Sequence, residues 1–87
     1  MRVKVEFFAT LREKFGKAVD VTLEGDARLV DVLRKVEGLY EEVVEGGEIK
    51  PRYKVLVNGL NVEFLEGLNT KVKDGDEICV FPPAGGG

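Results

Sequence analysis

The residues best suited to chemistry lie at the C-terminal end, which reads Pro82-Pro83-Ala84-Gly85-Gly86-Gly87 after Phe81. Two prolines favour an extended backbone and glycines carry no side chain, so we expect residues 82–87 to leave the domain as a slender tail. A glycine carboxylate can pass through a narrow channel into another enzyme, where ATP can convert it to an acyl-adenylate. The alternative is a frayed chain end without a function, because disorder concentrates at termini.

Other reactive groups are scarce in this sequence. It contains no histidine and one cysteine, Cys79, which excludes zinc sites of the Cys/His type, disulfides and histidine-based acid–base catalysis. No histidine is present to lower the pKa of the Cys79 thiol, so we expect a small apolar strand residue rather than a nucleophile.

Phosphate and metal chemistry are also poorly supported. The glycine runs at 46–47 and 85–87 lack the Lys-Ser/Thr pair of a phosphate-binding loop, so ATP chemistry must belong to a partner. Three acidic residues, Glu41, Glu42 and Glu45, are expected to form a solvated helix face, because nothing positions a converging set of metal ligands. We therefore expect no catalytic residues, no metal and no stably bound cofactor in this chain.

Length and composition limit the number of domains, the kinds of partner and the cellular location. The 87 residues fit one domain, and 13 Lys and Arg against 16 Asp and Glu give a net charge of −3, which disfavours nucleic-acid binding. No apolar run approaches the roughly 20 residues of a membrane-spanning helix, and the N-terminus lacks the apolar segment of a signal peptide. A cytoplasmic location is expected.

Alternating apolar residues predict strands, which we place at 3–7, 19–23, 53–57 and 77–81, with a short one beginning at 61–62. Asn58-Gly59 predicts a two-residue hairpin turn between the third strand and its short partner. Thr10 to Glu13 predicts a capping box that opens a short helix ending at Gly16. An apolar stripe from Leu29 predicts one long helix that ends at Gly46-Gly47.

The remaining segments are expected to be irregular. The loop 46–52 should be exposed and mobile. Phe64, Leu65 and Leu68 are expected to form a plug over the core. The element order predicts an α+β roll, in which two hairpins joined by a crossover helix place the first and last strands side by side and parallel. This is the architecture of the ubiquitin-like β-grasp, a mixed sheet with one long crossover helix, which we assign to residues 1–81.

Strand parity predicts an interface. If Val3, Val5 and Phe7 face the helix, Phe8 points to the opposite face, and Phe81 does so from the last strand. We expect these two rings, joined by Leu56, to form an exposed apolar patch beside the root of the tail. Such patches mark interfaces, although Phe8 could instead pack locally at a strand end.

Several pieces of the sequence together resemble the MoaD/ThiS group of sulfur carriers, most of all the small subunit of molybdopterin synthase. These pieces are Phe7-Phe8-Ala9, Leu11-Arg12-Glu13, Gly16, Val57-Asn58-Gly59, Asp74-Gly75-Asp76-Glu77, Phe81-Pro82-Pro83 and Gly86-Gly87. The likeness covers essentially the whole chain. The sequence departs from the family at Arg28, where Thr or Ser commonly precedes the helix, and at Asn61, near which a bulky apolar residue is common.

The resemblance implies a function for the tail. In that family an enzyme resembling ubiquitin-activating enzymes uses ATP to adenylate the C-terminal glycine, and a sulfur donor converts it to a thiocarboxylate. Gly87 would then carry the sulfur and Gly86 would allow the slim approach. The tail would enter the large subunit of molybdopterin synthase and donate dithiolene sulfur to the pyranopterin precursor of the molybdenum or tungsten cofactor. Phe8, Leu56, Phe81, Pro82 and Pro83 would contact the partner.

Three other functions begin from the same features. A ubiquitin-like modifier would join Gly87 to lysines of target proteins, and a carrier for tRNA thiolation would pass on the same sulfur. Both start with carboxyl adenylation, so the sequence does not separate them from the cofactor pathway. A β-grasp binding module with an inert tail is the third.

Overall fold

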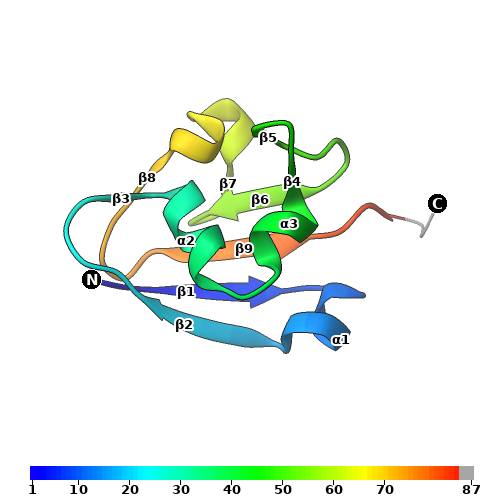
Figure 1. Cartoon of the computed structure of the whole chain (residues 1–87), viewed down its shortest axis with the longest axis horizontal. Coiled ribbons are helices and arrows are strands. Elements are labelled where there is room, and N and C mark those ends of the chain that lie inside the picture. The colour runs from blue at the N-terminus through cyan, green and yellow to red at the C-terminus, as the bar shows by residue number, and fades with distance from the viewer. Residues whose placement is uncertain (85–87) are drawn as a thin grey trace.

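The structure is a computed structural model that describes residues 1–84, which form a mixed sheet covered on one face by short helices (Figure 1). The main sheet has the order β2-β1-β9-β6-β7, with β1 (Arg2–Phe7), β2 (Ala18–Thr22), β6 (Lys54–Val57), β7 (Leu60–Asn61) and β9 (Glu77–Phe81). Two short ladders lie outside it, β3 (Ala27–Arg28) with β8 (Lys71–Val72) and β4 (Val44–Glu45) with β5 (Glu48–Ile49). The helices are α1 (Leu11–Phe15), α2 (Leu29–Lys35), α3 (Leu39–Val43) and the 3-10 turns η1 (Val62–Phe64) and η2 (Gly67–Asn69).

The first and last strands lie side by side at the centre of the sheet. β1 and β9 run parallel with Phe7 opposite Val80, as the connectivity predicts, and β6 lies antiparallel on the other side of β9 with Lys54 opposite Phe81. Both β1 and β9 end on the side of the molecule where α1 lies (Figure 1). The chain therefore leaves the sheet from a central strand that is hydrogen-bonded on both edges.

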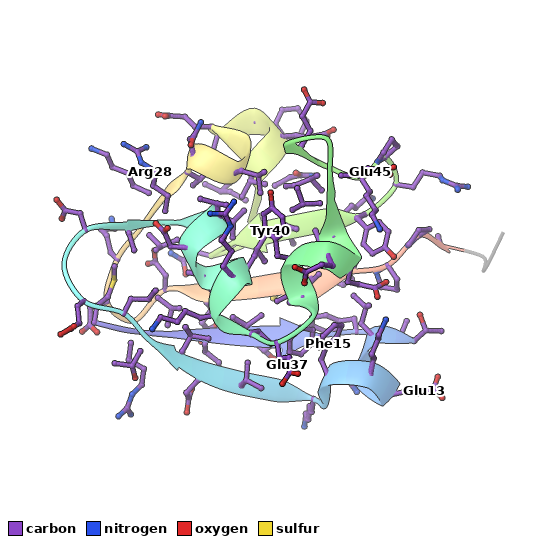
Figure 2. All side chains as sticks on the ribbon, viewed as in Figure 1. Glu13, Phe15, Arg28, Glu37, Tyr40 and Glu45 are labelled. Atoms are coloured by element: carbon purple, nitrogen blue, oxygen red, sulfur yellow. The ribbon has the colours of Figure 1, made fainter. Side chains whose placement is uncertain are left out.

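The core lies between the sheet and α2 and α3, where side chains from both layers fill the space (Figure 2). Strand residues alternate between this core and the outer face, so that Val5, Phe7, Ile78 and Val80 are fully buried. The ubiquitin-like β-grasp predicted from the sequence is confirmed by this architecture. Within residues 1–84, none of the helices has the length and apolar character needed to span a bilayer.

The prediction of one long helix is wrong, because the segment is broken into α2 and α3. Val36 after α2 is extended, and Gly38 before α3 has φ +81°, a left-handed conformation that glycine adopts readily. The Leu39 amide then donates to the Val36 carbonyl and starts the second helix. The apolar stripe stays buried on both sides of the break, so the spacing of the apolar residues did not reveal that the helix is interrupted.

The Thr10 capping box is also not formed. Thr10 has helical dihedrals and its side chain makes no capping hydrogen bond, although α1 ends at Gly16 as predicted. The predicted loop 46–52 contains a hairpin turn, since Gly46 and Gly47 both have positive φ and join β4 to β5. By contrast, the Asn58-Gly59 turn has the predicted positive φ at both residues.

Of the three residues predicted to form a plug over the core, only Leu68 does so. Phe64 and Leu65 are exposed, whereas Val62 at the start of η1 is fully buried and Leu68 packs against the core. The short partner strand begins one residue earlier than predicted, at Leu60.

Candidate functional site

The two aromatic rings predicted beside the tail lie together. Phe8 follows β1 and Phe81 ends β9, and the parallel register carries both to the same end of the sheet. Their rings stack with centroids 4.4 Å apart and planes 12° from parallel, and both side chains are half-buried. An offset stack of this kind stabilises each ring's position by about 1 kcal/mol. We refer to Phe8, Leu56 and Phe81 as the tail-root patch.

Leu56 and Cys79 continue the outer face of the sheet from Phe81. They lie opposite each other in the β6–β9 register, and both are half-buried. Burial raises the pKa of the Cys79 thiol, and the negative charges of Glu6 and Glu77 add to this effect. The thiol is therefore protonated at neutral pH, which is the opposite of what a nucleophilic cysteine needs.

Two cationic side chains flank the tail-root patch. The Arg12 guanidinium lies 5.3 Å from the centroid of the Phe8 ring, and its Nε donates to the Phe7 carbonyl at 2.8 Å. Lys54 is exposed and lies opposite Phe81 in the ladder. The surface at the tail root is thus apolar at its centre and positively charged on two sides, which suits a partner with an apolar surface and acidic surroundings.

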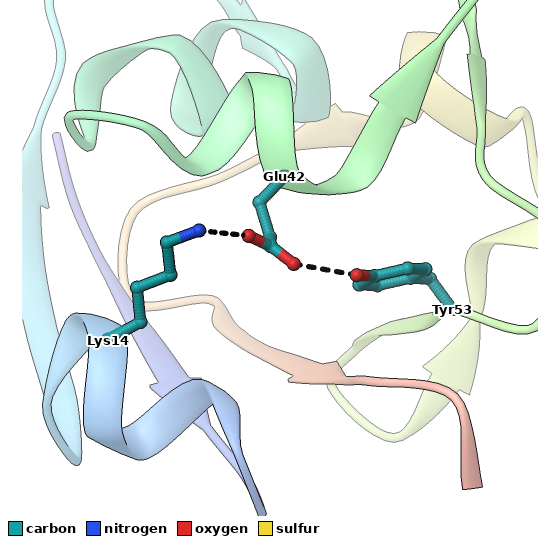
Figure 3. A network of polar contacts seen from close by, with 3 residues as sticks. All are labelled: Lys14, Glu42 and Tyr53. Carbon is teal, nitrogen blue, oxygen red and sulfur yellow. Dashed lines mark hydrogen bonds and ion pairs between the residues drawn. The ribbon is translucent and has the colours of Figure 1, made fainter. Parts of the chain in front are cut away.

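A polar network holds together the segments next to the patch (Figure 3). Lys14 of α1 donates to Glu42 Oε1 of α3 at 2.6 Å, and the Tyr53 hydroxyl donates to Glu42 Oε2 at 2.6 Å. These hydrogen bonds, from Lys14 first and then Tyr53, lower the pKa of Glu42, and the bond to Glu42 raises the pKa of Tyr53. The network joins α1, which follows Phe8, to the residue before Lys54.

Glu42 is therefore not part of a solvated acidic face, as its place in the helix predicted, because only 18% of its side chain is exposed. The sequence held no local signal for this role, since the three residues of the network come from α1, α3 and the residue before β6. In the part of the chain that the structure describes, no group of three or more His, Cys, Asp or Glu side chains could hold a metal ion.

The other predicted site residues belong to the tail. Pro82 and Pro83 follow Phe81 and are half-buried. Gly86 and Gly87 lie outside the described residues. The roles assigned to them, Gly87 as the residue that carries the sulfur and Gly86 as a residue slim enough to enter a narrow channel, therefore stay predictions. The partner contacts of the tail-root patch likewise stay predictions. Sequence reasoning missed Arg12 and Lys54 beside the patch, although strand parity alone would place Lys54 on the same face as Leu56.

A mixed sheet in which the first and last strands lie parallel at the centre, with helices on one face, defines a ubiquitin-like β-grasp protein. Comparison with known families then gives a direct assignment, because the ThiS family matches residues 5–87. The chain belongs to the ThiS family, which confirms the resemblance to the MoaD/ThiS group. The members that it resembles include both sulfur carriers and protein modifiers.

Two archaeal relatives show this range. Small archaeal modifier protein 3 of Haloferax volcanii is 42% identical over 92 aligned positions, covering 100% of both chains. A putative sulfur carrier protein of Archaeoglobus fulgidus is 37% identical over 62 residues, covering 69% of this chain and 70% of the relative.

Two solved structures are similar to nearly the whole chain. A chain of the Amycolatopsis orientalis BexX/CysO complex has 29% identity and a TM-score of 0.80, covering 98% of this chain and 99% of that chain. The putative molybdopterin converting factor, subunit 1, of Pyrococcus furiosus has 29% identity and a TM-score of 0.75, covering 95% and 98%.

Proposed function

We propose that this protein is a ubiquitin-like modifier and sulfur carrier, whose Gly87 carboxyl group is activated by a partner enzyme and joined to lysines of other proteins. The observation that carries the proposal is the 42% identity to a small archaeal modifier protein over the full length of both chains. The family match, which extends to residue 87, supports the same role for the tail. Protein modification thus has stronger support than the role in molybdopterin synthesis that the sequence motifs favoured.

The chemistry begins outside this chain. A carboxylate oxygen of Gly87 attacks the α-phosphorus of ATP in an adenylating enzyme, which forms an acyl-adenylate and releases pyrophosphate. A lysine amine then attacks the carbonyl carbon, forms an amide bond and expels AMP. A sulfur donor that attacks in place of lysine gives a thiocarboxylate and AMP. ATP and sulfur are supplied by the partner, and the need for ATP favours the cytoplasm.

This chain contributes position rather than catalysis. We assign partner docking to the tail-root patch, where an apolar surface lies between Arg12 and Lys54. Pro82 and Pro83 limit the conformations of the backbone that follows, so less entropy is lost when the tail enters a channel. Gly86 and Gly87 have no side chain that would prevent this entry.

The test is to identify conjugates in the cells that produce the protein. The variant Ala84→Arg creates a tryptic site just before the glycines, so a modified lysine keeps a Gly-Gly-Gly remnant of residues 85–87 that mass spectrometry detects. We expect this remnant on lysines of several proteins after purification under denaturing conditions. The matched control carries Ala84→Arg and lacks Gly87. Absence of the remnant, with the variant shown to be adenylated, would refute the modifier function.

A second candidate is the small subunit of molybdopterin synthase, and the similarity to the Pyrococcus furiosus converting factor favours it. Activation with ATP and a sulfur source would exchange one carboxyl oxygen for sulfur and add about 16 Da. The thiocarboxylated protein, mixed with a large synthase subunit and the pyranopterin precursor, is then expected to return to its original mass as sulfur is transferred. A mass gain without transfer to the pterin would support the modifier and tRNA-thiolation roles over this one.

A further inference from the structure

A second apolar surface lies on the segment that follows β6. Leu60, Phe64 and Leu65 are the large hydrophobic side chains that stand out as exposed among residues 1–84, with exposed fractions of 61%, 84% and 42%. Leu60 lies in β7, at one edge of the main sheet, whereas Phe64 ends η1 and Leu65 follows it. A phenylalanine exposed to this degree contributes nothing to the core, and grouped exposed apolar side chains mark an interaction surface. We call these three residues the η1 patch.

A groove of about 500 Å³ runs beside the η1 patch. Val57, Leu60 and Leu65 supply its apolar lining. Its charged lining has both signs: Glu66 comes from the segment after η1, whereas Lys71 and Lys73 come from β8 and the residue beyond it. Asp76 also lines the groove, but it is buried and accepts hydrogen bonds from the Asn58 side chain and the Lys73 amide. Glu66, Lys71 and Lys73 are exposed, and none of them forms an ion pair within residues 1–84.

We propose that the η1 patch binds a second copy of this chain in a two-fold symmetric dimer. A groove with exposed charges of both signs can be complementary to itself, because a two-fold rotation can bring Glu66 of each copy toward Lys71 and Lys73 of the other. The Phe64 side chain of each copy would enter the apolar groove of its partner. The groove volume is ample for one phenyl ring, so this contact would remove from water the most exposed apolar group of the η1 patch.

The proposed dimer would leave the tail accessible. In the ladders, Val57 at one end of β6 pairs with Leu60 and Ile78, whereas Lys54 at the other end pairs with Phe81. Leu60 of the η1 patch and Phe81 of the tail-root patch therefore adjoin opposite ends of β6. Both tails of a dimer could be activated, and the dimer does not depend on the chemistry proposed for Gly87.

Sedimentation equilibrium tests the proposal on the full chain. Three apolar side chains per copy make a small interface, so we expect a reversible dimer with a dissociation constant of about 0.1 mM. The variant Phe64→Ser keeps the fold, because the side chain is 84% exposed, and should weaken the dimer at least about tenfold. A single-chain mass at all concentrations up to about 1 mM would overturn the proposal.

Charge reversal separates this dimer from other modes of self-association. Glu66→Lys and Lys73→Glu should each reduce dimer formation, because each places like charges across the interface. An equimolar mixture of the two variants should form a heterodimer, since three of the four cross-interface pairs are then opposite in sign, against none in the Glu66→Lys homodimer and two in the Lys73→Glu homodimer. Lys17→Glu, an exposed charge reversal in the segment before β2, is the matched control and should dimerise like the original protein. Failure of the mixture to associate more strongly than either variant alone would contradict the two-fold arrangement.

Discussion

Replacing Glu42 with alanine tests how strongly the Lys14–Glu42–Tyr53 network stabilises the tail-root end of the fold. The Lys14 side chain is 63% exposed, so its ion pair contributes at most about 0.5 kcal/mol. The Tyr53 hydroxyl donates to a carboxylate that is mostly buried, and this charge-assisted bond contributes about 1.5 kcal/mol. Glu42→Ala should therefore lower the free energy of unfolding by about 2 kcal/mol and the Tm by about 10 °C.

Chemical denaturation of single variants divides this effect between the two partners. Tyr53→Phe should lower the free energy of unfolding by about 1.5 kcal/mol, and Lys14→Ala by no more than about 0.5 kcal/mol. If Lys14→Ala is the more destabilising change, the assignment of the energy to the buried half of the network is wrong. Additive effects of Glu42→Ala and Tyr53→Phe in a double variant would show that the two side chains do not interact.

The pKa of Glu42 gives an independent measurement. Folding lowers this pKa from 4.5, so the carboxylate stabilises the folded state above about pH 4.5 and loses that contribution as the pH falls through the lower, folded value. Glu42→Gln does not titrate at this position. The stability advantage of the original protein over Glu42→Gln should shrink below about pH 4.5. A constant difference from neutral pH to about pH 3 would refute the reasoning.

Three further predictions concern the tail and the helix break. Phe81→Asp loses the stack with Phe8 and should lower stability by about 1 kcal/mol, while partner binding measured by calorimetry weakens by about 2 kcal/mol or more; unchanged binding by the folded variant would show that the patch is not the docking surface. Deleting Gly87 or adding a residue after it should leave the melting temperature unchanged and slow ATP–pyrophosphate exchange roughly a hundredfold, because the activated carboxyl is displaced; normal exchange by both variants, with trimming excluded by mass, would dismiss Gly87 as the reactive residue. Gly38→Ala should lower the free energy of unfolding by about 1 kcal/mol because φ at this position is +81°; crowding is not the cause, since the added Cβ would lie 3.8 Å from Phe15 Cε1. Gly38→Asn should cost less, because asparagine tolerates this conformation better, and equal losses for the two variants would indicate another cause.

Strand pattern predicted the sheet well because alternation reports directly which face is buried. Val3, Val5 and Phe7 face the core, and the same parity placed Phe8 and Phe81 together on the other face. The helix break was invisible to this reasoning. Both helices bury the same stripe, so the period of the apolar residues is preserved across residues 36–38 while the backbone changes direction.

The side chains around the candidate site are held by contacts between segments that are distant in the sequence. These contacts were the features least predictable from the sequence. Lys14, Glu42 and Tyr53 are far apart in the sequence, and nothing in the residues around each of them indicates that they form a network. The Gly46-Gly47 turn, by contrast, could have been predicted as a hairpin, because Val44 and Ile49 flank it at matching positions. Phe64 was assigned to the core by its hydrophobicity alone, which does not distinguish burial from an interaction surface.

The position of β9 in the sheet places the tail-root patch where residues 82–87 begin. β9 is hydrogen-bonded to β1 on one edge and β6 on the other, so the backbone is held up to Phe81, where an edge strand would be free to fray. From that residue, the six residues 82–87 can span at most about 20 Å. An enzyme that docks on the tail-root patch must therefore hold its adenylating centre within about this distance of Phe81.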